Sequence, residues 1–146
     1  MDQRYGAPGE APTQSRSRTV AMNPPSVPAP IRGYYSNCVR VRAGSLLFIS
    51  GQIGTDAQGR VVGGDVAAQA DQALRNIELL LEANGASMKD VVKVTVYVTD
   101  MDDLDVIAPV RMKYFPVNGP ASAIVEVSRL ALPGLKVEIE AIAAVE

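Results

Sequence analysis

The chain offers few side chains suited to catalysis, because its 146 residues include no histidine and one cysteine. The absence of histidine removes the commonest general base and the commonest zinc ligand. No adjacent lysine is available to activate the Cys38 thiol, which we interpret as a small hydrophobic strand residue. Any catalysis is therefore expected to use carboxylates, tyrosines, serines, backbone amides or ordered water, with no metal ion or other cofactor.

Length and charge restrict the class of protein. The chain has the length of one domain, with 47% apolar and 21% charged residues. Without the first 30 residues, 11 basic side chains stand against 14 acidic ones and form no cluster. This balance argues against nucleic acid or an anionic membrane surface as a partner. No apolar run of about 18 residues is present, so no membrane-spanning helix is expected. The absence of a secretory signal and the single cysteine favour the cytoplasm.

Prolines and turn-forming residues divide the first part of the chain. Residues 1–30 hold six of the ten prolines and are predicted to form a flexible tail before one domain at 31–146. Strands are predicted at 35–42 and 46–50, and the turn-forming residues between them favour pairing as a hairpin.

Periodicity predicts the remaining elements. A helix is predicted between Asp65, a good N-cap, and Asn84, which Gly85 follows. Its apolar side chains form one stripe: Val66, Ala70, Ala73, Leu74, Ile77, Leu80 and Leu81, with Gln69 on another face. Alternation then predicts a strand at 91–99, a second helix within 100–115, and strands at 121–128 and 136–145. In the second helix, Pro109 either lies close to the first turn or kinks the helix.

The order β-β-α-β-α-β-β predicts an α+β fold with two helices on one face of a mixed sheet. The late strands carry apolar residues on both faces, since Ile124 alternates with Val125. No third layer exists in the sequence to cover the second face. We therefore expect self-association to cover it.

Five segments together resemble the RidA/YjgF family of reactive enamine/imine deaminases. They are Gly33-Tyr34-Tyr35-Ser36-Asn37, residues 47–53, the helix segment 68–76, the strand and turn at 92–103, and the two strands within 119–143. The matched region is residues 31–145. The resemblance implies a chorismate-mutase-like subunit in a homotrimer, with three clefts at the subunit interfaces.

The resemblance also implies an activity. Family deaminases act on enamines or imines such as 2-aminoacrylate: the enamine tautomerises, water adds to C=N, and ammonia leaves. By position, Tyr35, Ser50, Gly51 and Glu138 match residues that line the cleft, where Glu138 would position the water and Tyr35 would close the pocket. The residues alone allow other roles, because Tyr35 can pack at an interface, Gly51 can serve only a strand bend, and Glu138 can be an exposed strand residue.

Two positions depart from the family pattern. Ser122 stands where the deaminases carry an arginine that grips the substrate carboxylate, and Ala108 stands where some relatives place asparagine. A serine cannot form that bidentate, charge-assisted pair. Since each lost bond contributes roughly 1.5–3 kcal/mol, imino-acid binding should weaken at least about a hundredfold. Three arginines could supply a substitute guanidinium, Arg32, Arg111 and Arg129, but no sequence signal directs one to the cleft.

Two functions follow as hypotheses. The first is an enzyme that deaminates or tautomerises an enamine, imine or related unstable intermediate without the usual carboxylate anchor, in which Ser122→Arg should add imino-acid deaminase activity. The alternative is a non-catalytic trimer that binds a small metabolite or has a regulatory role. Ribonuclease activity, attributed to some relatives, is disfavoured by the negative charge.

Overall fold

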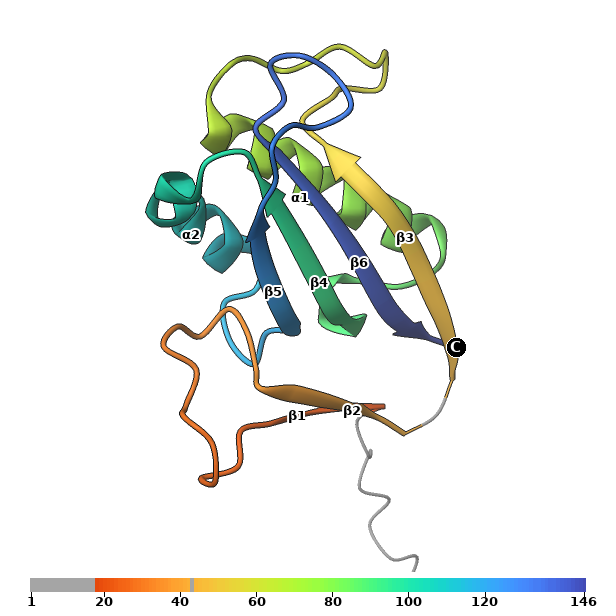
Figure 1. Cartoon of the computed structure of the whole chain (residues 1–146). Coiled ribbons are helices and arrows are strands. Elements are labelled where there is room, and N and C mark those ends of the chain that lie inside the picture. The colour runs from red at the N-terminus through yellow and green to blue at the C-terminus, as the bar shows by residue number, and fades with distance from the viewer. Residues whose placement is uncertain (1–17, 43) are drawn as a thin grey trace, which may run out of the picture.

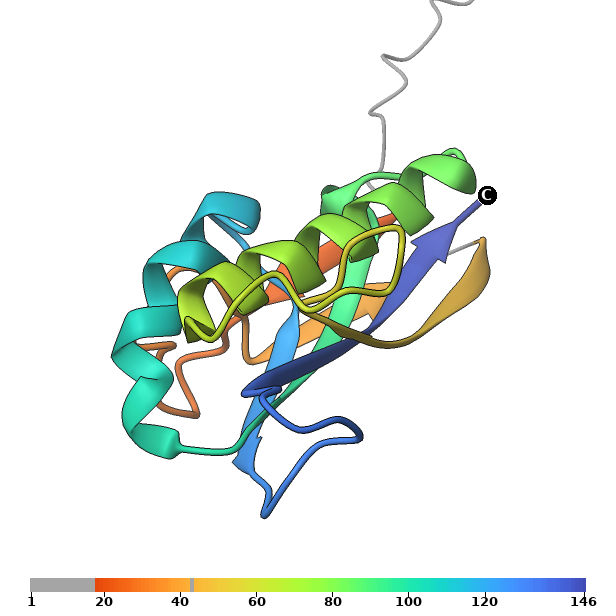
Figure 2. The ribbon, with the colours of Figure 1, turned by 90° about the horizontal axis from the view of Figure 1, so that it is seen from above.

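The computed structural model describes residues 18–42 and 44–146. Its strands and helices are β1 (Thr19–Met22), β2 (Cys38–Val41), β3 (Ser45–Ile53), α1 (Val66–Ala83), β4 (Val91–Val98), α2 (Leu104–Tyr114), β5 (Ala121–Glu126) and β6 (Val137–Val145), with short 3-10 helices at Met88–Asp90 and Met101–Asp103. The main sheet has the order β3-β6-β4-β5 (Figure 1), in which β4 and β5 run parallel and the other neighbours antiparallel. Figure 2 shows α1 and α2 on one face of this sheet, which confirms the predicted α+β fold.

The first two strands form a separate antiparallel pair, here called the β1–β2 ribbon. The predicted hairpin is wrong, because β2 pairs with β1 while β3 pairs with β6. Gly44 adopts a φ of 107°, which redirects the chain from the ribbon into the main sheet. Strand β1 lies within the stretch predicted as a tail, and the part of that prediction at residues 1–17 lies outside the described residues.

Helix α1 begins and ends where the sequence indicates. The Asp65 carboxylate accepts a hydrogen bond of 2.9 Å from the Ala67 amide, and Gly85 follows the helix with a φ of 68°. The predicted apolar stripe is buried except at Leu80, which is exposed.

Gln69 is fully buried, contrary to its predicted place on another face. Its amide nitrogen donates to the carbonyls of Gly63 (2.6 Å) and Gly134 (3.0 Å), and its oxygen accepts from the Lys136 amide at 2.8 Å. All its polar atoms thus have hydrogen-bond partners, so burying Gln69 leaves no unpaired amide in the interior. This one side chain joins the loop before α1 to the loop before β6.

Helix α2 begins at Leu104 and Pro109 lies in its second turn, which agrees with the predicted alternative that Pro109 lies close to the first turn. Near its end, the Tyr114 hydroxyl and the Lys113 ammonium both reach Asp71 Oδ1 of α1, at 3.1 and 2.9 Å. These contacts hold the two helices side by side over the sheet.

The core lies between the helices and the sheet. It includes Leu74, Ile77 and Leu81 of α1 and alternate residues of β4 and β6. The opposite face of the sheet is uncovered in this single chain, where Phe48 of β3 is 70% exposed and Val125 of β5 is also exposed. None of the helices in the described part of the chain is both long and apolar enough to cross a membrane.

Candidate active site

The sheet divides the sequence-predicted site residues into two groups. One set, here called the carboxylate group, lies on the uncovered face and comprises Glu138, Gly51 and the exposed Ser50. The other, here called the arginine group, lies at β5 on the helix-covered side and comprises Tyr35, Ser122 and Ala108. Of the three arginines considered from sequence, Arg111 joins the arginine group, and the structure adds Tyr34.

In the carboxylate group, Gly51 provides the space that the Glu138 side chain fills. A Cβ atom on Gly51 would come within 2.7 Å of Glu138 Cδ and would overlap Oε1. Gly51 also lies at an irregularity in the β3–β6 pairing, between Ile49 and Gln52. The glycine therefore serves both the predicted strand bend and the placement of the carboxylate.

Two further polar side chains lie beside Glu138 on this face. The Tyr97 hydroxyl donates to Glu140 Oε1 at 2.8 Å, and Tyr97 is the register partner of Glu138. The bond to Glu140 is the main reason that the pKa of Tyr97 is raised, with burial and the charges of both carboxylates acting in the same direction. Glu138 itself has no hydrogen-bond partner among the described residues, so its carboxylate oxygens are free to accept hydrogen bonds from water.

In the arginine group, Arg111 extends from α2 to Ser122. Its Nη2 donates to Ser122 Oγ at 2.6 Å, and its Cζ lies 4.4 Å from the centroid of the Tyr34 ring. The side chain is only 3% exposed. Burial lowers the pKa of Arg111, while Tyr34 and Tyr35 oppose that shift.

The backbone before β2 is fixed against β5 close to Ser122. The Ser36 amide donates to the Pro120 carbonyl at 3.1 Å, and Ser36 forms a bridge with Ala121. Gly119 permits this approach, since a Cβ there would overlap the Tyr34 carbonyl. Within the described chain, the buried Ser36 hydroxyl is the one buried side-chain polar atom without a hydrogen-bond partner.

The remaining predicted residues frame this group. Tyr35 is half-buried, its hydroxyl accepts from the Ile31 amide at 3.0 Å, and its ring lies 5.7 Å from the ring of Tyr34. Ala108 is buried in the core one turn before Arg111. Of the other two arginines considered from sequence, Arg32 instead pairs with Asp105 at 2.6 Å.

One chain does not bring the two groups together. Ser122 is aligned with Val94 of β4, whose side chain is in the core, whereas Glu138 is aligned with Tyr97 on the uncovered face. The two residues thus lie on opposite faces of the sheet, two strands apart and three residues along the strand direction. At about 3.3 Å per residue, the offset along the strands is roughly 10 Å.

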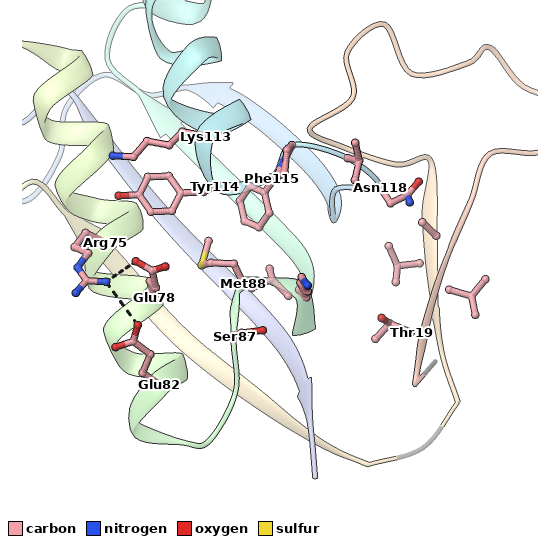
Figure 3. A pocket seen from close by; sticks show the side chains of 17 residues that line it. Thr19, Arg75, Glu78, Glu82, Ser87, Met88, Lys113, Tyr114, Phe115 and Asn118 are labelled. Carbon is pink, nitrogen blue, oxygen red and sulfur yellow. Dashed lines mark hydrogen bonds and ion pairs between the residues drawn. The ribbon is translucent and has the colours of Figure 1, made fainter. Parts of the chain in front are cut away.

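The structure also contains a cavity of about 960 Å³ under the β1–β2 ribbon. Its walls come from the ribbon, the C-terminal half of α1 and the segment after α2, as Figure 3 shows. Arg75 on one wall forms ion pairs with Glu78 and Glu82, while Thr19 of the ribbon lies on the opposite side and Phe115 between them (Figure 3). The cavity includes none of the sequence-predicted site residues. No group of three or more acidic or cysteine side chains in the described residues is placed to hold a metal ion.

Comparisons with known proteins give consistent relatives. A family profile described as endoribonuclease L-PSP matches residues 26–145. A RutC family protein of Pyrococcus horikoshii is 48% identical over 119 residues, 81% of this chain and 91% of that protein. The 2-iminobutanoate/2-iminopropanoate deaminase of Homo sapiens is 42% identical over 113 residues, 76% of this chain and 80% of that protein. A solved structure from Yersinia pestis, described as a protein of unknown function of the conserved Rid family, superposes with a TM-score of 0.81 at 32% identity and covers 88% of this chain and 99% of that one.

Proposed function

Because the chain belongs to the RidA/YjgF family, we propose that it accelerates the hydrolysis of a reactive enamine or imine. The observation that carries this proposal is the 42% identity to a 2-iminobutanoate/2-iminopropanoate deaminase over 113 residues. The arrangement at Gly51 and Glu138 supports it, since a carboxylate with no competing hydrogen bond in the described chain is available to a water molecule.

The proposed reaction is the addition of water to a C=N bond. The water oxygen bonds to the imine carbon, one water proton passes to the nitrogen, and the resulting carbinolamine loses ammonia to leave a carbonyl product. Glu138 accepts a hydrogen bond from the attacking water, takes up its proton as the oxygen bonds to the carbon, and returns that proton to the nitrogen, a general-base role. An enamine must first tautomerise to the imine, and the same carboxylate can relay the proton that moves.

A complete cleft requires a second copy of the chain, because the two groups of residues lie on opposite faces of one sheet. We propose a homotrimer in which the uncovered face with Glu138, Gly51 and Ser50 meets the side of a neighbouring copy that carries Tyr35 and Ser122. The exposed Phe48 and Val125 support an association of this face, since an exposed apolar sheet face is a typical interaction surface.

The test generates imines in situ with an amino-acid oxidase and compares the rates of imine decay with and without the protein. The formation of ammonia and 2-oxo acid measures that decay. Glu138→Gln should reduce the acceleration about a hundredfold or more. Glu140→Gln is the matched control, because Glu140 lies on the same strand and face and bonds Tyr97. No acceleration by the wild-type protein over buffer would overturn the proposal, and ligand binding without turnover would favour the non-catalytic alternative.

RNA is not proposed as a substrate, although the family profile is described as an endoribonuclease. The 11 basic and 14 acidic side chains after residue 30 provide no net attraction for phosphates. RNA binding that weakens steeply with salt in a filter assay would contradict this view. We also propose a cytoplasmic location, since a single cysteine suits a reducing compartment.

A further inference from the structure

We propose that Arg111 binds the carboxylate of the substrate, together with Ser122 and the face of Tyr34. The substrate is then an α-imino acid, although position 122 lacks the arginine of the family's deaminases. The inference rests on the proposed deaminase function and specifies its substrate class. It assigns the anion-binding role to a helix residue instead of a strand residue.

The first argument is the cost of burying an unneutralised cation. Arg111 is 3% exposed, yet it forms no ion pair within residues 18–42 and 44–146, where its contacts are Ser122 Oγ and the Tyr34 ring. A buried charge is usually paired, because desolvation of an isolated ion is unfavourable. The lowered pKa of Arg111 has the same physical cause. The guanidinium therefore lacks an anion that a bound ligand can supply.

The second argument is geometric. A guanidinium has five N–H donors, and the bond to Ser122 uses one of them. Tyr34 covers one face of the planar group, which is the usual arrangement of a cation over an aromatic ring, so the donors along the edge stay available. Two parallel N–H donors on such an edge match the two oxygens of a carboxylate.

The third argument is that the guanidinium lies beside residue 122 itself. Ser122 Oγ is in contact with Arg111 Nη2, so the guanidinium occupies space that a longer side chain at position 122 would fill. A serine leaves room for Arg111 and orients it by accepting its hydrogen bond. The two placements of an arginine exclude one another sterically and by like charge. Ser122→Arg alone should therefore not add activity, which reverses the expectation from sequence.

The experiment compares four proteins: wild type, Arg111→Gln, the exchange Arg111→Ser/Ser122→Arg, and Lys113→Gln. Lys113→Gln is the matched control, because it removes a cation from the same helix that points to Asp71 instead. Calorimetry measures the Kd of 2-oxobutanoate, a carboxylate product, and kinetics compare an α-imino acid with an imine that lacks a carboxylate. Circular dichroism and the Tm of each variant verify folding.

Arg111→Gln should weaken 2-oxobutanoate binding about a hundredfold, the loss expected for two charge-assisted hydrogen bonds. The kcat/KM of Arg111→Gln should fall much more on the α-imino acid than on the imine without a carboxylate, and Lys113→Gln should behave as wild type. The exchange variant should regain most of the binding, which also covers the case in which Arg111→Gln does not fold.

Two results would overturn the assignment: unchanged 2-oxobutanoate affinity in a folded Arg111→Gln protein, or no carboxylate binding by the wild type. The proposed function fails separately. If the wild type binds 2-oxobutanoate through Arg111 but accelerates no imine hydrolysis, the anion site stands and the deaminase activity does not.

Discussion

Replacing Gly51 by alanine should disable the Glu138 carboxylate while leaving the fold intact. The added methyl group would overlap Glu138 Oε1 and come within 2.7 Å of Cδ. Overpacking in a rigid core costs about 1–3 kcal/mol. Here the obstructing atoms are the end of a half-buried, flexible side chain, which can rotate away. We therefore expect a loss of at most about 1 kcal/mol in the free energy of unfolding, a value at the low end of that range.

The effect on catalysis should be much larger than the effect on stability. A positioned general base contributes about 10²–10⁴-fold to a rate, so a displaced Glu138 should lower kcat toward the level of Glu138→Gln. Urea denaturation and imine-hydrolysis kinetics measure the two quantities on the same protein. In a double-mutant cycle, Gly51→Ala/Glu138→Gln should be no slower than Glu138→Gln alone, because both changes remove one function. Full activity of Gly51→Ala, or additive losses in the cycle, would refute this reasoning.

Three further changes test other parts of the structure. Phe48→Arg on the uncovered face should reduce the mass measured by light scattering to that of one chain, whereas Leu79→Arg on the exposed side of α1 should not; an unchanged mass for Phe48→Arg would contradict the proposed interface. Gln69→Leu should cost about 1–3 kcal/mol in urea denaturation, since the loop carbonyls of Gly63 and Gly134 and the Lys136 amide lose the side chain that joins them. The pKa of Tyr97 is raised above 10.0, so its contribution to stability is fully present below pH 10 and is lost as the pH rises through the folded pKa. The free energy of unfolding should thus fall more steeply above pH 10 in the wild type than in Tyr97→Phe, and parallel curves would contradict the role of the Glu140 bond.

The elements with strong local signals were predictable from sequence. Asp65 and Gly85 delimit α1, and alternation defines β4 and β6, because helix caps and strand periodicity are local properties. The pairing of β2 was not predictable in this way. It depends on four residues of β1 within a proline-rich stretch, and on the turn that Gly44 makes, neither of which has a periodic pattern.

The site was predictable in its parts but not in its connection. The family pattern identified position 122 as the place where the deaminases carry an arginine and this chain carries a serine. Arg111 follows Ile107 and Ala108 by four and three residues and therefore shares their face of α2, but the burial of that face is known only from the structure. An arginine within a buried helical stripe needs a polar destination, and only the structure identifies Ser122 as that destination.

The β1–β2 ribbon gives the protein a convenient position for a spectroscopic probe. Cys38 is the one cysteine in the chain, lies exposed on β2, and donates its thiol hydrogen to the Met22 carbonyl across the ribbon. It follows Tyr34, which covers the Arg111 guanidinium, by four residues. A single fluorophore attached there, without any engineered cysteine, would report on the backbone that leads to the carboxylate site. Ligand binding could then be followed optically, in real time, on an otherwise native chain.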